Sequence, residues 1–183
     1  MPDRRAQLLD AALGLVAGKG MKGLTHRAVD AAAGFAEGTT SNYYRNRTAL
    51  VDAVLDRLLE LDAELLRNTA PAGPPADIAE LSGQLAAMVL VLAGKHAGIT
   101  RARMALSLDR PEAVTAGHHL LVGGLEHTLA AMGMPDAAAR ARDVADYGDG
   151  LMLHLLTVRR DEQPDTAAIA AAVRRLLGPD PAS

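Results

Sequence analysis

A run of small polar side chains occupies residues 39–42, where Thr39, Thr40, Ser41 and Asn42 follow one another. The carboxamide of Asn pairs with adenine in the major groove of DNA, and the methyl group of Thr packs on the methyl group of thymine. Bulky apolar residues at these positions would indicate a buried segment instead. We therefore expect an exposed polar face here, with Thr39, Thr40 and Asn42 as candidates for contacts with base edges.

A base-reading face needs a scaffold helix before it and a tight turn between the two elements. Residues 25–33 are predicted to form a short helix, because the hydroxyl of Thr25 can cap its start and Gly34 ends it. The polar segment 37–42 is too short to hold itself as an isolated helix and needs support from its neighbours. Helix, Gly turn and second helix together predict a helix-turn-helix.

Longer helices are predicted on both sides of this motif. Residues 5–19 carry one apolar stripe and end at a pair of glycines, Gly18 and Gly20. Asn46 caps a long helix over 47–67, and the proline-rich segment 70–75 interrupts the chain as a loop. Five further helices are predicted at 78–92, 100–108, 112–132, 136–159 and 166–177.

Composition supports an all-α fold. Ala and Leu, which favour helices, dominate the apolar residues, whereas the chain has three Tyr, one Phe and no Trp. We expect a three-helix helix-turn-helix head at residues 1–50, joined by a long helix to a helical body at residues 51–183. The head carries seven basic and four acidic residues, a net charge of +3, and the body carries −6. A small basic head on an acidic body is typical of a DNA-binding domain attached to a body that does not bind DNA.

Composition also limits the cellular compartment that we expect and the kinds of reactive site that the chain can form. The chain has no Cys, so it offers no disulfide or thiol nucleophile. No signal peptide is evident at the N-terminus, and the most apolar stretch, residues 85–93, is too short to span a bilayer. We expect a soluble, cytoplasmic protein with no membrane partner, no cofactor and no metal site. His118 and His119, being adjacent, point about 100° apart on a helix and do not easily share one ion.

The order of motifs in residues 4–56 resembles the DNA-binding domain of the TetR family of transcriptional repressors. The match covers about a third of the chain and is dense. It is carried by Arg5-Ala-Gln-Leu-Leu-Asp-Ala-Ala12, Gly20, Thr25, Ala33-Gly34-Phe35, Gly38-Thr39-Thr40-Ser41-Asn42-Tyr43-Tyr44 and Asn46-Arg47-Thr48-Ala49-Leu50.

The resemblance implies roles for individual side chains. Tyr43 matches a tyrosine that hydrogen-bonds the DNA backbone, Arg47 stands where a lysine usually reaches a phosphate, and Tyr44 matches a core position. Thr25 marks a helix start that can meet a phosphate, and Arg27 completes the predicted DNA-binding set. Glu37 departs from the pattern: it is either a solvated charge at a helix start or an acceptor for a cytosine amino group.

The resemblance also implies a ligand-binding and dimerising body, without indicating the ligand. An interface between two copies is expected at Gly150, Leu151, Leu155, Val173 and Leu177. An effector cavity is expected to involve Met88, Arg101, Met104, His119 and Tyr147.

The predicted function is a ligand-responsive regulator, a repressor by resemblance, that binds a palindromic operator in double-stranded DNA as a homodimer. A small-molecule effector of unknown identity is expected to release it. Two alternatives from other classes are a helical enzyme and a protein–protein adaptor. The enzyme would need a nucleophile–base or metal constellation, and none is evident in the sequence. The adaptor would leave the polar face at residues 39–42 unexplained. The operator sequence, and whether the regulator represses or activates, are open at this point.

Overall fold

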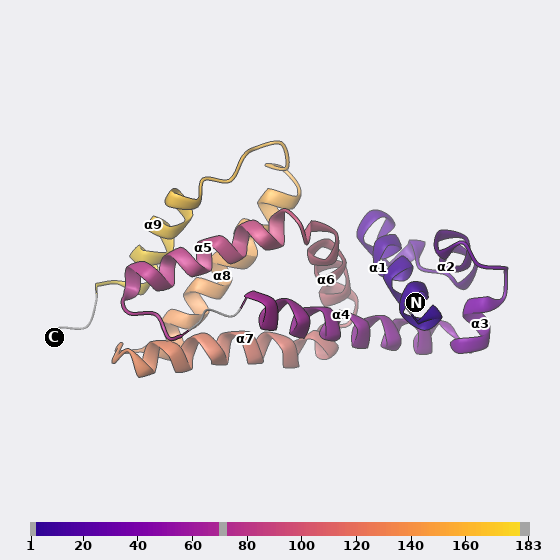
Figure 1. The fold of residues 1–183 in the computed structure, drawn as a ribbon, viewed down its shortest axis with the longest axis horizontal. Helices are drawn as coiled ribbons and strands as arrows, with labels where there is room; N and C mark the ends of the chain where they lie inside the picture. The colour runs from indigo at the N-terminus through magenta and orange to yellow at the C-terminus, as the bar shows by residue number, and fades with distance from the viewer. Residues whose placement is uncertain (1–2, 70–72, 180–183) are drawn as a thin grey trace. The chain divides into compact units, whose positions relative to one another are not determined.

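The computed structural model describes residues 3–69 and 73–179. Within these residues the chain forms nine helices and no strand, which confirms the all-α fold (Figure 1). It divides into two compact units: unit 1 comprises Met1–Asn68 and Gly98–Thr115, and unit 2 comprises Thr69–Ala97 and Ala116–Ser183. The loop predicted at residues 70–75 lies partly outside the described residues.

Unit 1 contains the predicted helix-turn-helix. Its helices are α1 (Arg4–Gly23), α2 (His26–Ala33), α3 (Thr39–Tyr43), α4 (Arg47–Thr69) and α6 (Ala97–Asp109). The core is a contiguous apolar cluster from α1, α2, α4 and α6. Leu8, Leu50 and Leu106 are among its fully buried side chains.

Local sequence signals set the helix ends in unit 1. The hydroxyl of Thr25 accepts from the backbone N–H of Ala28 and caps α2, and Asn46 accepts from the N–H of Ala49 at the start of α4. Gly34 ends α2 with a φ of 72°, in the left-handed region that glycine adopts most readily. Gly20, with a φ of 65°, interrupts α1 where its end was predicted.

The segment at residues 98–115 returns the chain to unit 1. Ala102 and Leu106 of α6 are both fully buried in the unit 1 core. The guanidinium of Arg103 also pairs with the carboxylate of Asp62 on α4 through two of its nitrogens. The core of unit 1 is therefore completed by a helix that lies beyond residues 1–68 in the sequence.

Unit 2 has a separate core. Its helices are α5 (Ile78–Ala93), α7 (Pro111–Ala131, from residue 116 onward), α8 (Ala137–Leu156) and α9 (Thr166–Leu177). α5 packs against α8 and α9, and α8 packs against α9. Ile78, Leu129 and Leu177 are buried in its core. Of the helices described, none alone is long and apolar enough to cross a membrane, and α5 with α6 passes that test only when the two are taken together as a bent pair.

Candidate nucleic-acid interface

The outer face of α3 presents the polar side chains that the sequence singles out. Ser41 and Asn42 are exposed, and Thr39 is partly exposed. Thr40 is fully buried, so the expectation that it faces outward with its neighbours is wrong. Successive residues on a helix are about 100° apart, so a five-residue helix that packs on the core at Thr40 must turn Asn42 away from it. The face of α3 that points away from the core, its free face, therefore consists of Thr39, Ser41 and Asn42. The hydroxyl of Thr39 donates to the backbone oxygen of Ala36 at 2.6 Å.

A carboxylate on α2 holds the N-terminal end of α3. Asp30, which is 2% exposed, accepts from the backbone N–H of Gly38 at 2.8 Å through Oδ2. Its Oδ1 accepts from the backbone N–H of Thr40 at 2.7 Å and from the hydroxyl of Thr40 at 2.5 Å. α3 has no side-chain cap of its own, because Gly38 occupies its N-cap position with a φ of 93°. Asp30 thus supplies the acceptor that a Ser or Asp at the N-cap usually provides.

The environment of Asp30 favours its charged form. Burial raises the pKa of this carboxyl, but the hydrogen bonds donated by the hydroxyl and N–H of Thr40 and the N–H of Gly38 lower it more. The nearby His26 lowers it further, and the pKa of Asp30 lies below its ordinary value. The carboxylate of Asp30 is therefore ionised at neutral pH, and both of its oxygens accept hydrogen bonds.

The C-terminal end of α3 is held through Tyr44. Its ring is buried, in agreement with its predicted core position, and its hydroxyl accepts from Nε of Arg5 at 3.1 Å. Nε2 of His26 lies 2.7 Å from the backbone oxygen of Tyr44. The adjacent Tyr43 is 47% exposed, with its ring centre 6.3 Å from that of Tyr44. Tyr43 is thus free at the surface beside an anchored neighbour.

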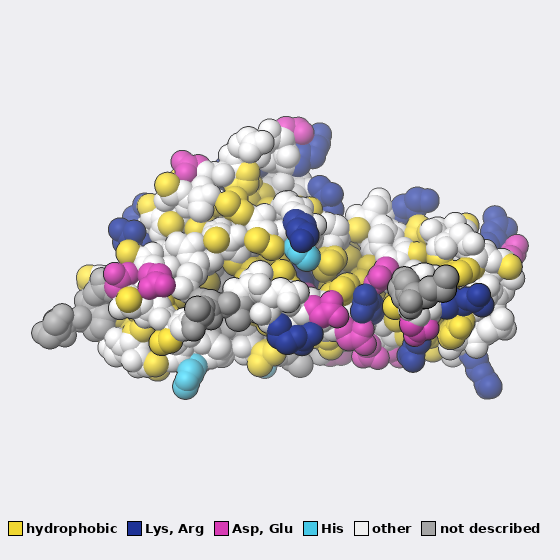
Figure 2. Space-filling model, viewed as in Figure 1, with side chains coloured by type: hydrophobic (Ala, Val, Ile, Leu, Met, Phe, Trp, Pro, Cys, Tyr) yellow, Lys and Arg dark blue, Asp and Glu magenta, His cyan; other side chains and the backbone are white. Residues whose placement is uncertain are grey.

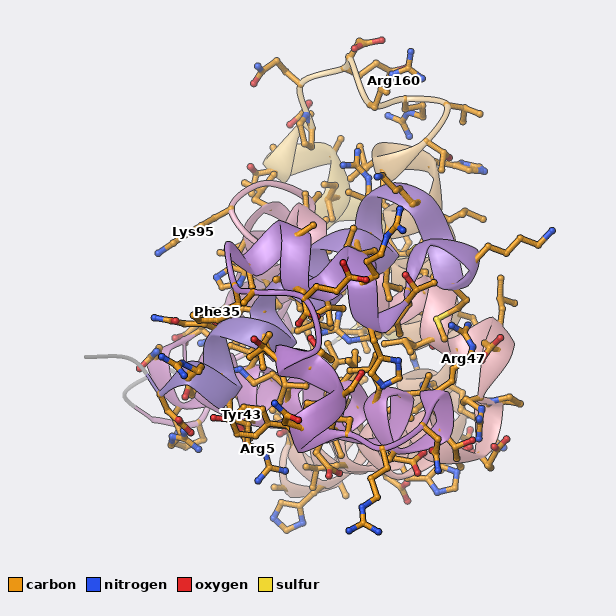
Figure 3. The ribbon with its side chains drawn as sticks, turned by 90° about the vertical axis from the view of Figure 1, so that its right-hand side faces the viewer. Arg5, Phe35, Tyr43, Arg47, Lys95 and Arg160 are labelled. Atoms are coloured by element: carbon orange, nitrogen blue, oxygen red, sulfur yellow. The ribbon has the colours of Figure 1, made fainter. Side chains whose placement is uncertain are left out.

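Arg47 has partners within its own chain. Its guanidinium donates to the backbone oxygen of Met21 at 2.7 Å and also to that of Leu24. Both carbonyls follow the break at Gly20 in α1, and the backbone oxygen of Met21 also accepts from the N–H of Leu24 at 3.3 Å. In Figure 3, Arg47 and Tyr43 lie on different sides of unit 1. The structure therefore gives Arg47 a bridging role between α4 and the end of α1, whereas the family resemblance implies a phosphate contact.

Charged side chains are distributed unevenly over unit 1. On the face shown in Figure 2, Lys and Arg side chains lie around α1 to α3, and Asp and Glu side chains gather over α4. The predicted phosphate ligand Arg27 is exposed on α2. On α4, Arg57 bonds Asp10 of α1 at 2.8 Å and Glu60 at 3.0 Å. The bond to Asp10 is the main cause that raises the pKa of Arg57, with burial opposing it and Glu60 adding to it. The helix-turn-helix side of the unit thus has the more basic surface.

Unit 2 has a hollow of about 320 Å³ along α8 and α9. Tyr147, Leu151 and Leu155 line one side, and Ile169, Ala172 and Arg175 line the other. Tyr147 is the residue of the predicted effector set that reaches this hollow.

The remaining members of the predicted effector set are divided between the units. Arg101 and Met104 belong to unit 1, and Met88 and His119 belong to unit 2. Arg101 and His119 are exposed, whereas Met88 and Met104 are partly exposed. The assignment of these residues to one effector cavity stays a prediction.

The residues predicted for a dimer interface divide into two groups. Leu155, Val173 and Leu177 are buried within the chain, and Val173 and Leu177 belong to the core of unit 2. These three were wrongly expected at the surface, because an apolar stripe fits the chain's own core as well as a partner. Gly150 is exposed and Leu151 is half-buried. Nothing lies within 4 Å of a Cβ built on Gly150, so this position faces open space in the protomer.

Among residues 3–69 and 73–179, no group of three or more His, Asp or Glu is placed to hold an ion.

Comparison with protein families decides the class of this protein. Residues 8–54 match the model described as bacterial regulatory proteins, tetR family, and residues 76–179 match the tetracyclin repressor-like C-terminal domain. The chain belongs to the TetR family. Members of this family are DNA-binding transcriptional regulators, so the protein is a regulator and not an enzyme. Comparison with curated proteins gave no match.

Solved TetR-family structures resemble the whole chain. A crystal structure of the multidrug binding protein EbrR complexed with imidazole is 29% identical, with a TM-score of 0.67, and the match covers 100% of this chain and 99% of EbrR. The complex of EbrR with malachite green is 27% identical over 97% and 99% of the two chains, with a TM-score of 0.70. A TetR-family member from Streptomyces coelicolor A3 is 26% identical over 97% and 99%, with a TM-score of 0.72.

Two residues of the TetR-type head were not among the predicted site residues. Ser41, like Asn42, is exposed, whereas the sequence predicts base contacts for Thr39, Thr40 and Asn42. The predicted site also omits Asp30, although the position of this residue in the sequence offers a signal. It lies next to Val29 and three residues before Ala33, both predicted to face inward. A carboxylate on the inner face of a scaffold helix needs donors, and the exposed amides of a following helix that starts at Gly38 are such donors.

Proposed function

We propose that this chain is a ligand-responsive repressor that binds a near-palindromic operator as a homodimer and is released by a small-molecule effector. The observation that carries the proposal is the free polar face of α3, formed by Thr39, Ser41 and Asn42, on a helix whose two ends are held by other parts of unit 1. Polar side chains presented on a fixed helix are what base reading in the major groove requires.

The proposed contacts with DNA are of two kinds: contacts with bases, which determine sequence preference, and contacts with phosphates, which position the protein on the duplex. We propose that Asn42 and Thr39 reach base edges, and that Tyr43 on α3 and Arg27 on α2, both exposed, bond phosphates. Thr25 lies at the start of α2, where the N-terminal amides attract a phosphate. In this proposal residues 1–50 provide DNA binding, and residues 51–183 provide effector binding and dimerisation.

Homodimerisation follows from the small size of the reading face. One five-residue helix makes few base contacts, and a second copy roughly squares the discrimination. Two-fold symmetry then requires inverted half-sites about one helical turn apart, or ~34–36 Å. On unit 2, Gly150 offers a point of close approach, and Leu153 nearby is 50% exposed. We place the interface on this outer face of α8 together with α9.

Effector binding is proposed by analogy with EbrR, whose structures contain imidazole or malachite green. Release from DNA requires that the effector bind the DNA-incompetent conformation more tightly than the competent one. The coupling is reciprocal, so operator DNA must weaken effector binding by the same factor. The hollow beside Tyr147 is one candidate site in unit 2.

The experiment starts by selecting duplexes from a random pool with the full-length protein. We expect one enriched sequence with inverted symmetry, bound with an affinity that falls steeply as salt rises. Malachite green and imidazole are then titrated into the selected complex, with light-scattering mass measured in parallel. A selected sequence without inverted symmetry, or a monomer that binds at full affinity, would refute the dimeric operator complex. Failure to enrich any sequence would refute the proposed function itself.

A further inference from the structure

The orientation of α3 depends on contacts outside the helix. A helix of five residues is not stable alone, because nucleation costs more than its few internal hydrogen bonds return. Its N-cap, Gly38, has no side chain to accept from the first amides. The position of its free face is therefore set by the groups that bond its ends.

Asp30 is the group that bonds the N-terminal end. Its two carboxylate oxygens accept from the N–H of Gly38 at 2.8 Å, the N–H of Thr40 at 2.7 Å and the Thr40 hydroxyl at 2.5 Å. Because these donors lie on successive parts of one helical turn, the carboxylate fixes both the axial position of α3 and its rotation. Thr40 is turned inward by these bonds and is fully buried.

The rotation of α3 decides which side chains face DNA. With Thr40 directed to Asp30, Asn42 lies about 200° around the helix, on the opposite side. A small rotation of α3 would move the carboxamide of Asn42 away from a base edge, whereas contacts with phosphates tolerate such a shift better, because they depend less on precise direction.

We propose that Asp30 is a specificity-positioning residue, whose buried carboxylate orients α3 so that Thr39, Ser41 and Asn42 read bases. The proposal rests on the DNA-binding function proposed above. Asp30 itself contacts no base, since it is buried behind the helix.

In the variant Asp30→Asn, the loss of charge and the loss of positioning affect different quantities. The first changes generic affinity for DNA, and the second changes discrimination between DNA sequences. Removing a negative charge from the DNA-binding unit leaves generic affinity for DNA unchanged or strengthens it. At the same time, the amide group of Asn places a donor against one of the N–H donors of Gly38 or Thr40. Loss of positioning therefore lowers discrimination between sequences without lowering generic affinity.

The test measures the ratio of two dissociation constants. One is for the duplex selected by the wild type, and the other is for a scrambled duplex of the same composition. For Asp30→Asn we expect the ratio to fall ~10-fold or more, the order of one lost base contact. Asp52→Asn is the matched control, because Asp52 is exposed on α4 and the change of charge is the same. This control should keep the wild-type ratio.

A purely structural role would leave the ratio unchanged. Partial unfolding lowers the active fraction equally for both duplexes, so it cancels in the ratio. If Asp30→Asn does not fold, Thr40→Val and Thr40→Ser decide instead, because Val removes one donor to Asp30 and Ser keeps it. We then expect a lower ratio for Val and the wild-type ratio for Ser.

Two results would overturn the inference. One is a wild-type ratio in Asp30→Asn, or in Thr40→Val when Asp30→Asn does not fold. The other is a wild type that enriches no duplex, which refutes the proposed function and this inference with it. A folded wild type that discriminates, with variants that do not, supports both.

Discussion

Replacing Arg47 by Ala separates a bridging role from a phosphate contact. The guanidinium bonds the backbone oxygens of Met21 and Leu24, at the end of α1 that follows the break at Gly20. If these bonds are its function, the variant loses stability in unit 1 and keeps its electrostatic contacts with DNA. If Arg47 instead bonds a phosphate, the variant keeps its stability and loses part of the salt dependence of binding.

The expected loss of stability follows from the two bonds. Hydrogen bonds from charged donors contribute about 1.5–3 kcal/mol each, but the side chain of Arg47 is exposed and water competes for it. We therefore expect a total of about 1–2 kcal/mol. For a unit of this size, 1 kcal/mol corresponds to a fall of about 4–8 °C in melting temperature. The melting temperature of unit 1 should thus fall by about 4–16 °C.

The assay combines thermal melting with DNA binding at several salt concentrations. Each phosphate contact contributes about 0.9 to the slope of log affinity against log salt, so two copies would contribute ~2. Arg45→Ala is the control, because Arg45 is exposed close to α3 and should reduce the slope with little effect on melting. A variant Arg47→Ala that melts like the wild type and lowers the slope by ~2 would refute the bridging role.

Three further predictions concern base preference, the pH dependence of stability and dimerisation. Asn42→Ala should relax preference at one base pair of each half-site by about 1–3 kcal/mol, and an unchanged selected sequence would refute this. Because the pKa of Asp30 is lowered in the folded state, its contribution to unfolding free energy is full above about pH 4, the ordinary Asp pKa, and is lost as pH falls through the folded value. The stability difference between wild type and Asp30→Asn should therefore shrink on acidification below about pH 4, and a difference that stays constant down to acid unfolding would contradict it. Gly150→Glu should give folded monomers by light scattering, because its side chain enters open space in the protomer, whereas the control Gly124→Glu on α7, equally open, should remain dimeric. A dimeric Gly150→Glu would show that the interface lies elsewhere.

Much of the fold is predictable from the sequence because the helix ends carry local signals. Thr25, Asn46 and Gly34 act at α2 and α4 as the residue types indicate. Where such signals are weak, the boundaries shift. The sequence predicts that α8 continues to residue 159, because no Gly or Pro lies between Gly150 and Pro164, but the helix ends at Leu156.

The features that the sequence could not predict depend on which surfaces come into contact in the folded protein. Periodicity groups Leu155 with other apolar residues, but it does not tell a partner's surface from the chain's own core. Thr40 has the same polarity as Thr39, and only the position of Asp30 explains why one is buried and the other is not. Arg47 is a cation at a helix start in either role, and the carbonyls that it bonds are more than twenty residues away.

The return of α6 to unit 1 bears on how such regulators can be recombined. A fragment ending at residue 68 would lack Ala102 and Leu106, leaving an apolar surface on α1 and α4 uncovered and prone to aggregation. A chimera that joins this DNA-binding head to a foreign sensor therefore needs three junctions, one after residue 68 and one on each side of residues 98–115, in place of a single cut. The portable module is thus interrupted in sequence, and any exchange that preserves operator choice must carry both pieces.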